Sequence, residues 1–225
     1  MTDDPTTAVL FDIDGTLADS NYPHVDAWWR AFHAAGQPVD AWRIHRCIGM
    51  DSSSLLDELV GSADSDVAKQ AKEFHTAYYR EHFQELHILP GVHDLLEEVA
   101  RRGHKVVLAT SAPEAELAIL RELLQIEDTI EVVTSGGDVE QAKPDPGIIQ
   151  LALERSGADP DHAIMVGDSK WDVIAAGRAG VAAIGVLSGG ISEAELREAG
   201  AVAVFDDPAA ILAGIDDSPI GQLGA

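Results

Sequence analysis

The sequence predicts an α/β fold: a Rossmann-like parallel sheet core flanked by helices, with an inserted helical cap domain. Two observations support this prediction. Short apolar runs rich in β-branched residues alternate with segments of helical periodicity, which is typical of a parallel sheet covered by helices. Between the first and the second of these runs, residues 18–89 contain several helical stretches and no convincing strand.

The expected strands and helices alternate along the rest of the chain. Several of the helices have Pro near their start or Gly after their end, which are common helix boundaries. The expected strands cover residues 8–11, 105–110, 130–135, 163–167, 181–186 and, as a short last one, 202–205. The expected helices cover residues 92–102, 113–124, 146–156 and 170–179.

This pattern divides the chain into three parts. Residues 1–17 and 90–214 form the core domain, and residues 18–89 form the helical cap domain. An insertion of about 70 residues is within the size range of a small domain. Residues 215–225 are small and acidic, and we expect them to be a flexible tail.

The charge of the chain excludes several classes of partner. Fifteen Lys and Arg against 39 Asp and Glu give a formal net charge of −24. This charge repels nucleic-acid phosphates and anionic membranes, so we expect neither as a partner. A phosphate-bearing ligand must therefore be met by local positive charge, backbone amides or a metal ion. The sequence does not reveal the oligomeric state.

The cysteine content and the N-terminus predict a cytoplasmic protein. Cys47 is the single cysteine, so no internal disulfide can form. Residues 1–7 are polar and acidic and lack the basic start and apolar core of a secretory signal. No apolar run approaches the length of a membrane span.

Chemically active side chains follow four of the expected strands. In an open parallel sheet, ligands bind outside the carboxyl ends of the strands, so these side chains converge on one crevice if the strands are adjacent. They are Asp12 and Asp14 after the first strand, Thr110 and Ser111 at the end of the second, Lys143 beyond the third, and Asp168 and Asp172 after the fourth.

The carboxylates at these strand ends predict a metal site. Asp12 and Asp14 are two residues apart on an extended segment, so they point the same way. Together with Asp168 they concentrate negative charge that a cation must offset. Oxygen ligands without His or Cys favour Mg²⁺. Structural roles remain open for each group, because Asp14 with Gly15 can start a turn and Asp168 or Ser169 can cap a helix.

The hydroxyls and the lysine also have structural alternatives. Thr110 and Ser111 can be turn-forming residues at a strand end, and an isolated loop lysine such as Lys143 is usually solvated. The conjunction of all these groups, in this order and at strand ends, favours a functional site over the separate structural roles.

The four motifs together resemble those of the haloacid dehalogenase superfamily, over residues 8–214. Residues 12–16, Asp-Ile-Asp-Gly-Thr, are similar to the first motif, Thr110 to the second, Lys143 to the third, and Gly167-Asp168 with Asp172 to the fourth. The helical insert after the first motif is similar to the cap of the phosphoglycolate phosphatase and β-phosphoglucomutase group.

The resemblance implies a Mg²⁺-dependent phosphatase that hydrolyses a phosphate monoester of a small metabolite, such as a phosphoglycolate-like acid or a sugar phosphate. Asp12 would attack phosphorus to give an aspartyl-phosphate. Asp14 would protonate the leaving alcohol and later deprotonate water. The implied metal ligands are Asp12, Asp14 through its carbonyl, Asp168 and Asp172, and the implied phosphate-binding groups are Thr110, Ser111 and Lys143.

Two alternatives to a phosphatase stay open. One is a β-phosphoglucomutase-like mutase, because His24 follows Asp12 by the spacing found there for a histidine that assists the acid/base Asp. His24 can equally cap or pack its helix or orient Asp14 in a phosphatase. Residues 51–54 lack the arginine that mutases place there for a sugar phosphate, which disfavours the mutase. The other alternative is a non-catalytic phospho-acceptor module, although such modules have no helical cap.

The aromatic residues of the cap have two possible roles. Trp28, Trp29, Phe32 and Trp42 can line a substrate pocket or fill the core of the cap. At helical spacing such residues are more often core, so we expect the second role.

Overall fold

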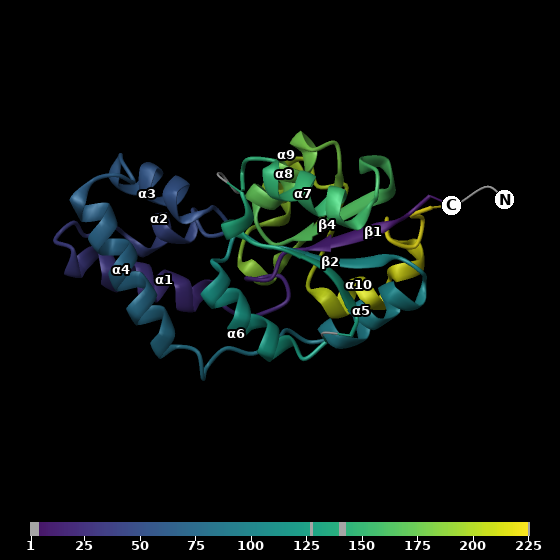
Figure 1. Ribbon diagram of the computed structural model, residues 1–225, viewed down its shortest axis with the longest axis horizontal. Coiled ribbons are helices and arrows are strands. Elements are labelled where there is room, and N and C mark those ends of the chain that lie inside the picture. Colours follow the sequence, from purple (N-terminus) through teal and green to yellow (C-terminus); the bar gives the residue numbers. More distant parts are fainter. Residues whose placement is uncertain (1–4, 127, 140–142, 225) are drawn as a thin grey trace.

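A parallel sheet with its covering helices and a separate group of helices make up the molecule, and Figure 1 shows them side by side along its long axis. The computed structural model describes residues 5–126, 128–139 and 143–224. The strands form one sheet in the order β3-β2-β1-β4-β5-β6. They are β1 (Ala8–Phe11), β2 (Lys105–Ala109), β3 (Ile130–Thr134), β4 (Ala163–Gly167), β5 (Ala182–Val186) and β6 (Ala203–Phe205).

The strand order places β1 and β4 side by side in the middle of the sheet. Phe11, the last residue of β1, is in register with Leu108 of β2 and Val166 of β4. The chain continues from β1 to β2 and β3 on one side, and from β4 to β5 and β6 on the other. Ligands bind where the strand order reverses in this way. The segments that follow β1, β2 and β4 therefore meet at one place.

Helices cover both faces of the sheet. Alternate residues of a strand point to opposite faces, so each strand contributes to two apolar clusters. Val9 and Phe11 of β1 belong to one apolar cluster, and Ala8 and Leu10 belong to the other. The helices of the first cluster are α5 (Val92–Arg101), α6 (Glu114–Leu124) and α10 (Pro208–Ala213), and those of the second are α7 (Gly147–Ser156), α8 (Lys170–Arg178) and α9 (Glu193–Ala199).

The helices between β1 and α5 have an apolar core of their own, and we call them the cap. Trp28 and Phe32 are buried in this core, whereas Trp29 and Trp42 are exposed. The expectation that these aromatics fill the cap core therefore holds for Phe32 and in part for Trp28, which also lines the cavity described below. The cap helices are α1 (Asn21–Ala34), α2 (Ala41–His45), α3 (Ser52–Val60) and α4 (Asp66–Glu81).

The fold class predicted from the sequence is confirmed by the parallel sheet and its flanking helices. All predicted strands and the four predicted core helices agree with the observed elements to within one residue at each end. The short helices α9 and α10 were not predicted. Among the described residues, no helix is both long enough and apolar enough to cross a membrane.

The segment after Gly214 differs from the flexible tail that the sequence predicts. Residues Ile215–Asp217 form a short 3-10 helix. Ile215 and Ile220 are buried in the first apolar cluster, because their side chains cover the end of the sheet domain beside α10. The two buried isoleucines hold this segment against the core up to residue 220. The small and acidic composition of the segment does not indicate this packing.

Candidate active site

Asp12 and Asp14 extend the central strand into a tight turn. The backbone amide of Asp12 donates to the carbonyl of Val166 at 3.0 Å, which continues the pairing with β4 beyond the end of β1. Gly15 has a φ of +74°, and a Cβ atom there would lie 2.3 Å from the Asn21 side chain and 2.6 Å from Asp168. Only glycine allows this turn to approach both residues, so the start of α1 comes to lie against the end of β4.

Lys143 is fully buried beneath Asp12 and is not the solvated loop lysine of the structural alternative. Its Nζ lies 2.6 Å from Asp12 Oδ1 and 2.7 Å from Asp172 Oδ1. Burial disfavours the charged lysine, but the two carboxylates outweigh it and raise the pKa of Lys143. Burial also raises the pKa of Asp12, against the attraction of Lys143.

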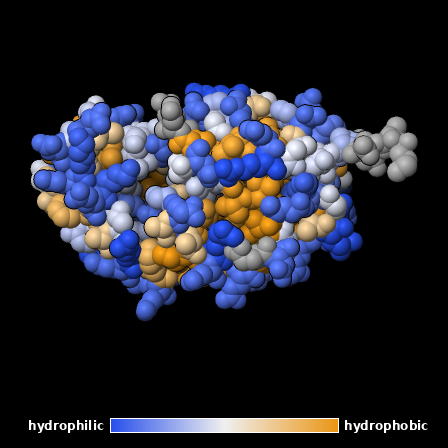
Figure 2. Space-filling model, viewed as in Figure 1, coloured by the Kyte–Doolittle hydropathy of each residue, from blue (hydrophilic) through white to orange (hydrophobic). Residues whose placement is uncertain are grey.

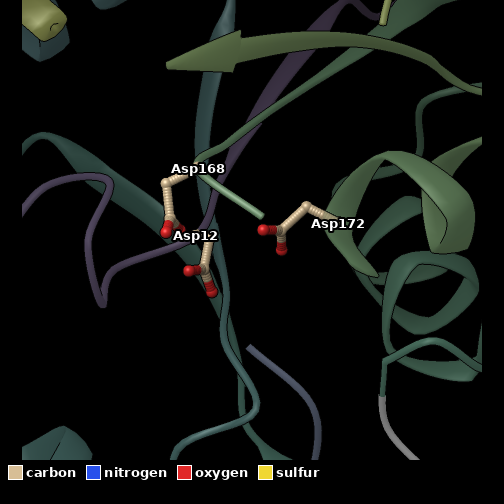
Figure 3. A group of neighbouring side chains, drawn as sticks. All are labelled: Asp12, Asp168 and Asp172. Carbon is tan, nitrogen blue, oxygen red and sulfur yellow. The ribbon is translucent and has the colours of Figure 1, made fainter. Parts of the chain in front are cut away.

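Asp12, Asp168 and Asp172 form a cluster that can hold a metal ion. They come from the segments after β1 and β4 and from α8, and Figure 3 shows their carboxylates directed toward a common space. One oxygen from each lies within 4.8 Å of the others, and all three residues are buried. Burial, followed by the charge of Asp172, raises the pKa of Asp168 to about 7. This excess of buried negative charge and the all-oxygen donor set fit Mg²⁺.

The two aspartates contributed by β4 and α8 are held differently. Asp168 accepts hydrogen bonds from Thr16 Oγ1 at 3.2 Å and from Asn21 Nδ2 at 2.8 Å. Asp172 Oδ2 accepts from the backbone amide of Ser169 at 3.1 Å, as part of the capping box of α8, and from Ser169 Oγ at 2.6 Å, while its Oδ1 faces Lys143. Oδ2 of Asp172 is thus hydrogen-bonded within the protein and Oδ1 is held by the ion pair with Lys143, which suits a supporting role beside a metal ion.

Asp14 lies at the edge of the site, in contact with the first cap helix. Ser20 Oγ donates to Asp14 Oδ1 at 2.5 Å, and His24 Nε2 lies 3.4 Å from the same oxygen. Burial opposes ionisation, but the contacts with His24 and Ser20 lower the pKa of Asp14. Burial likewise opposes a charged His24, yet Asp14 raises the pKa of that imidazole. A proton shared by this pair therefore resides mainly on His24.

A second histidine supports His24 from α4. His24 Nδ1 lies 3.2 Å from His75 Nε2, and the two rings stack with those of Trp28 and Tyr79. Burial lowers the pKa of His75 well below its usual range. A neutral His75 can accept a proton from His24 Nδ1 in a hydrogen bond, which leaves His24 Nε2 to donate toward Asp14.

The hydroxyls at the end of β2 face the same site. Thr110 is buried, and its Oγ1 accepts from the amide of Ala112 at 3.0 Å, which leaves the hydroxyl proton free to donate. Ser111 is partly exposed, and its Oγ donates to the carbonyl of Gly49 in the cap at 3.4 Å. The end of β2 is thus both a donor surface and a contact with the cap.

A cavity of about 90 Å³ lies between the cap and the sheet domain. A single water needs roughly 10–15 Å³ on this scale, so the cavity has room for a small ligand. Of the predicted site residues, Asp12, Asp14, Thr110, Ser111 and His24 line it. Asp168, Asp172 and Lys143 lie next to Asp12 in the buried cluster instead.

Sequence reasoning missed several side chains of the site, among them Asn21, His75 and Glu116. Asn21 contacts Asp168, and His75 and Glu116 line the cavity. No local pattern distinguishes Asn21 or Glu116 from other polar residues at a helix start. The sequence around His75 shows no metal-ligand spacing and gives no sign of burial, yet its ring is buried against those of His24, Trp28 and Tyr79.

Comparisons with known proteins agree on one family. The model of the family described as haloacid dehalogenase-like hydrolase matches residues 9–186. A phosphoglycolate phosphatase from Rhodospirillum rubrum is 35% identical over 214 residues, which cover 91% of this chain and 88% of that protein. A phosphorylated carbohydrates phosphatase from Thermotoga maritima is 34% identical over 201 residues, which cover 88% of this chain and 93% of that protein.

Solved structures extend the similarity to the whole fold. A hydrolase from Pseudomonas syringae superposes with a TM-score of 0.89 at 35% identity, and the match covers 94% of this chain and 99% of that one. A putative β-phosphoglucomutase from Bacteroides vulgatus has a TM-score of 0.86 at 20% identity, with 99% of this chain and 91% of that one covered. The second match is evidence for the fold alone.

Proposed function

This chain belongs to the haloacid dehalogenase-like hydrolase family, and on that premise we propose that it is a Mg²⁺-dependent phosphatase of small phosphate monoesters. The observation that carries the proposal is the position of Asp12. Its carboxylate lines the cavity, pairs with the buried Lys143, and belongs to the acidic cluster that can hold a metal ion. A nucleophile, a cation and a metal site thus meet at the floor of a ligand-sized cavity.

The first step is attack of an Asp12 oxygen on phosphorus, which forms the aspartyl-phosphate and breaks the bond to the leaving oxygen. The leaving oxygen takes a proton from Asp14, which receives it from His24. In the second step water attacks the phosphorus of the aspartyl-phosphate, and Asp14 accepts the proton of that water. Phosphate leaves and the carboxylate of Asp12 is restored, so the cycle closes.

The remaining charged groups meet the negative charge of the phosphoryl oxygens. Lys143 carries a permanent positive charge next to Asp12, and Thr110 and the region of Ser111 supply hydrogen-bond donors. Mg²⁺ held by Asp12, Asp168 and the carbonyl of Asp14, with Asp172 in support, would stabilise charge at the transferred phosphoryl group.

The alternatives receive less support from the cavity. Asp51, which belongs to the segment where mutases place an arginine, caps α3 by accepting from the amides of Ser53 and Ser54. Ser52 lines the cavity, and no arginine does so among the described residues. A non-catalytic phospho-acceptor has no need of an acid/base group such as Asp14 with His24. Both alternatives therefore rank below hydrolysis.

The location of the protein is also part of the proposal. Cys47 is buried, and burial raises the pKa of its thiol to about 11, so it is an inert thiol that suits a reducing compartment. We infer a cytoplasmic enzyme whose partner is a small phosphorylated metabolite. Nucleic acid is not a partner on grounds of the net charge of −24.

The test is release of inorganic phosphate from a panel of monoesters, with Mg²⁺ and with a chelator in its place. The panel contains p-nitrophenyl phosphate, 2-phosphoglycolate, glycerol phosphate and sugar phosphates. Mg²⁺-dependent multiple turnover of at least one compound supports the proposal. Conversion of β-glucose 1-phosphate to the 6-phosphate without release of phosphate favours the mutase, and a single phosphorylation without turnover favours the acceptor module.

A further inference from the structure

Glu116 is a buried carboxylate in the wall of the cavity that has no part in the reaction described above. Only 8% of this residue is exposed, and it lines the cavity together with Asp14, His24 and His75. Within the part of the chain that the structure describes, its carboxylate has no hydrogen-bond partner and no ion pair. Burying a carboxylate without a hydrogen-bond partner costs free energy. A hydrogen-bond donor on a ligand in the cavity would offset that cost.

The local structure gives Glu116 no capping role. It is the third residue of α6, where a glutamate commonly reaches back to the backbone N–H of the N-cap residue. The N-cap of α6 is Pro113, which has no N–H to donate. Glu114, on the first turn of the same helix, is exposed and does not line the cavity. Burial of Glu116 is therefore not explained by the helix.

The charged groups around Glu116 determine which groups of a ligand can bind next to it. Burial raises the pKa of Glu116, and the charge of Asp14 acts in the same direction, while His24 and Lys72 favour the ionised form. Lys72 is the only cation besides histidine that lines the cavity among the described residues, and it is exposed at the rim. The carboxylates of Asp12, Asp14 and Glu116 make the interior of the cavity negatively charged, so a carboxylate on the leaving group would be repelled there.

From this geometry we propose that Glu116 selects the leaving group of the substrate: it accepts a hydrogen bond from a hydroxyl and rejects a carboxylate. The preferred substrates are phosphate monoesters of small polyols, and phosphorylated hydroxy acids are poor substrates. This inference rests on the proposed phosphatase activity. It goes beyond that activity because it separates two substrate classes that phosphate chemistry alone treats alike.

A neutral hydroxyl suits the site better than an ammonium group. A cationic leaving group would meet the carboxylate of Glu116, but it would also lie near the ammonium group of Lys72. A hydroxyl donates one hydrogen bond to Glu116 without adding a charge of either sign. The volume of about 90 Å³ limits the leaving group to a few carbon atoms.

The experiment compares two substrates that differ only at the distal carbon. These are 2-hydroxyethyl phosphate and 2-phosphoglycolate, with glycerol 3-phosphate and 3-phosphoglycerate as a second matched pair. The quantity measured is the ratio of kcat/KM for the hydroxyl compound to kcat/KM for the carboxylate compound. The wild-type ratio exceeds one in both pairs. Glu116→Gln removes the charge at constant size, and the ratio falls by about tenfold, because the neutral amide accepts a weaker hydrogen bond from the hydroxyl and no longer repels the carboxylate.

Glu114→Gln is the matched control because it makes the same change on an exposed position of the same helix. Its ratio equals that of the wild type. Thermal unfolding of both variants checks that they fold. If one compound of a pair turns over too slowly, the ratio is formed from the reciprocals of the competitive inhibition constants of both compounds against p-nitrophenyl phosphate.

The outcomes separate this inference from the function on which it rests. Preference for 2-phosphoglycolate in the wild type, or an unchanged ratio in Glu116→Gln while p-nitrophenyl phosphate is hydrolysed, overturns the role of Glu116 and leaves the phosphatase intact. Failure of Mg²⁺ to support hydrolysis of every compound, p-nitrophenyl phosphate included, overturns the proposed function itself.

Discussion

Lys143 shows how strongly one residue can link stability to chemistry. Its ammonium group is the counter-ion of Asp12 and Asp172, and all three side chains are buried. Replacement by methionine leaves two buried carboxylates without their cation, which costs about 3–5 kcal/mol of unfolding free energy.

Chemical denaturation of Lys143→Met in the presence of chelator measures this loss. Lys69→Met is the control, because Lys69 is exposed on α4 and surface changes of this kind stay within about 0.5 kcal/mol. Equal stability of the two variants would contradict the role of Lys143 as the buried counter-ion.

In the proposed mechanism, His24 and His75 act on the leaving group through Asp14. His24→Asn lowers kcat for an alkyl phosphate by about 100-fold, in the range of general acid catalysis. The same variant lowers kcat for p-nitrophenyl phosphate much less, because that leaving group needs no proton. A uniform loss for both substrates would show that His24 serves the fold and not the proton transfer.

His75→Phe tests the second histidine, because phenylalanine keeps the stack with Trp28 and Tyr79 but removes the acceptor for His24. Like His24→Asn, His75→Phe lowers kcat for the alkyl phosphate more than kcat for p-nitrophenyl phosphate, but by a smaller factor. The effects of the two changes are not additive in the double variant, since both act on one hydrogen-bonded chain.

If Asp168 is a metal ligand as proposed, it makes metal binding depend on pH. Its carboxyl has a pKa of about 7 in the folded protein without metal, against an ordinary value of 3.8. The folded state therefore holds a proton that the unfolded state has lost, and the stability from this group is lost as the pH rises through about 7. Mg²⁺ must displace the same proton, so the affinity of the site for Mg²⁺ increases as the pH rises through about 7.

The measurement is the increase in Tm caused by Mg²⁺, which is larger at pH 8 than at pH 6. In Asp168→Asn most of the increase is lost at both pH values. A Mg²⁺ effect that is independent of pH in the wild type would contradict the assignment of Asp168 as a ligand.

At the scale of elements, α8 links the acidic cluster to helix capping. Ser169 is the N-cap of α8, and its hydroxyl donates to Asp172, the residue that faces Lys143. Ser169→Ala costs about 1 kcal/mol of stability, the usual effect of a lost N-cap. It also lowers kcat, because Asp172 loses one of the groups that hold it.

The helix α9 supplies a matched control for this prediction. Ser192 caps α9 in the same capping-box arrangement with Glu195, outside the cavity wall. Ser192→Ala loses a similar amount of stability and keeps its activity. Equal activity of the two variants, measured at saturating Mg²⁺, would show that the α8 cap has no influence on the site.

The elements that could be predicted are those whose buried residues form a recognisable pattern in the local sequence. Residues 8–11 and 163–167 are continuous apolar runs, because both of their faces are covered, and the observed strands have the same bounds. The helices α9 and α10 are short, although Ser192 with Glu195 is a capping signal that could have located the first of them.

Contacts between distant segments could not be predicted in this way. Asn21 and Asp168 are 147 residues apart, and they meet only because the strand order places β4 next to β1. The burial of Glu116 depends on how the cap covers α6, which no pattern around residue 116 records. The motif residues Asp12, Lys143 and Asp168 were accessible from the sequence because each follows an expected strand.

For the molecule as a whole, the cavity exists because the cap lies against the sheet domain. His45 contacts the carbonyl of Gly189 at 2.9 Å, and Trp171 Nε1 donates to the carbonyl of Arg46 at 3.2 Å. The two linkers are also paired, since the amide of Leu89 donates to Leu17 at 2.9 Å. We expect the cap to move about these linkers when ligands enter, at residues 18–22 and 89–91.

The surface is consistent with a small substrate. The face shown in Figure 2 is mostly hydrophilic, and the chain has a net charge of −24. Such a charge slows the approach of anionic ligands, so the positive charge that receives a phosphate must lie inside. Lys143 and a metal ion at the acidic cluster meet that requirement next to Asp12.

The central claim is that Asp12 carries the phosphoryl group during turnover. The direct measurement uses Asp14→Asn with p-nitrophenyl phosphate and Mg²⁺, because this leaving group needs no acid, whereas hydrolysis of the intermediate needs Asp14 as base. After an acid quench, mass spectrometry of the peptides locates any added phosphoryl group. We predict one phosphoryl group on Asp12 and none in the Asp12→Asn variant. Release of p-nitrophenol with the phosphoryl group on another residue, or on none, would contradict the account.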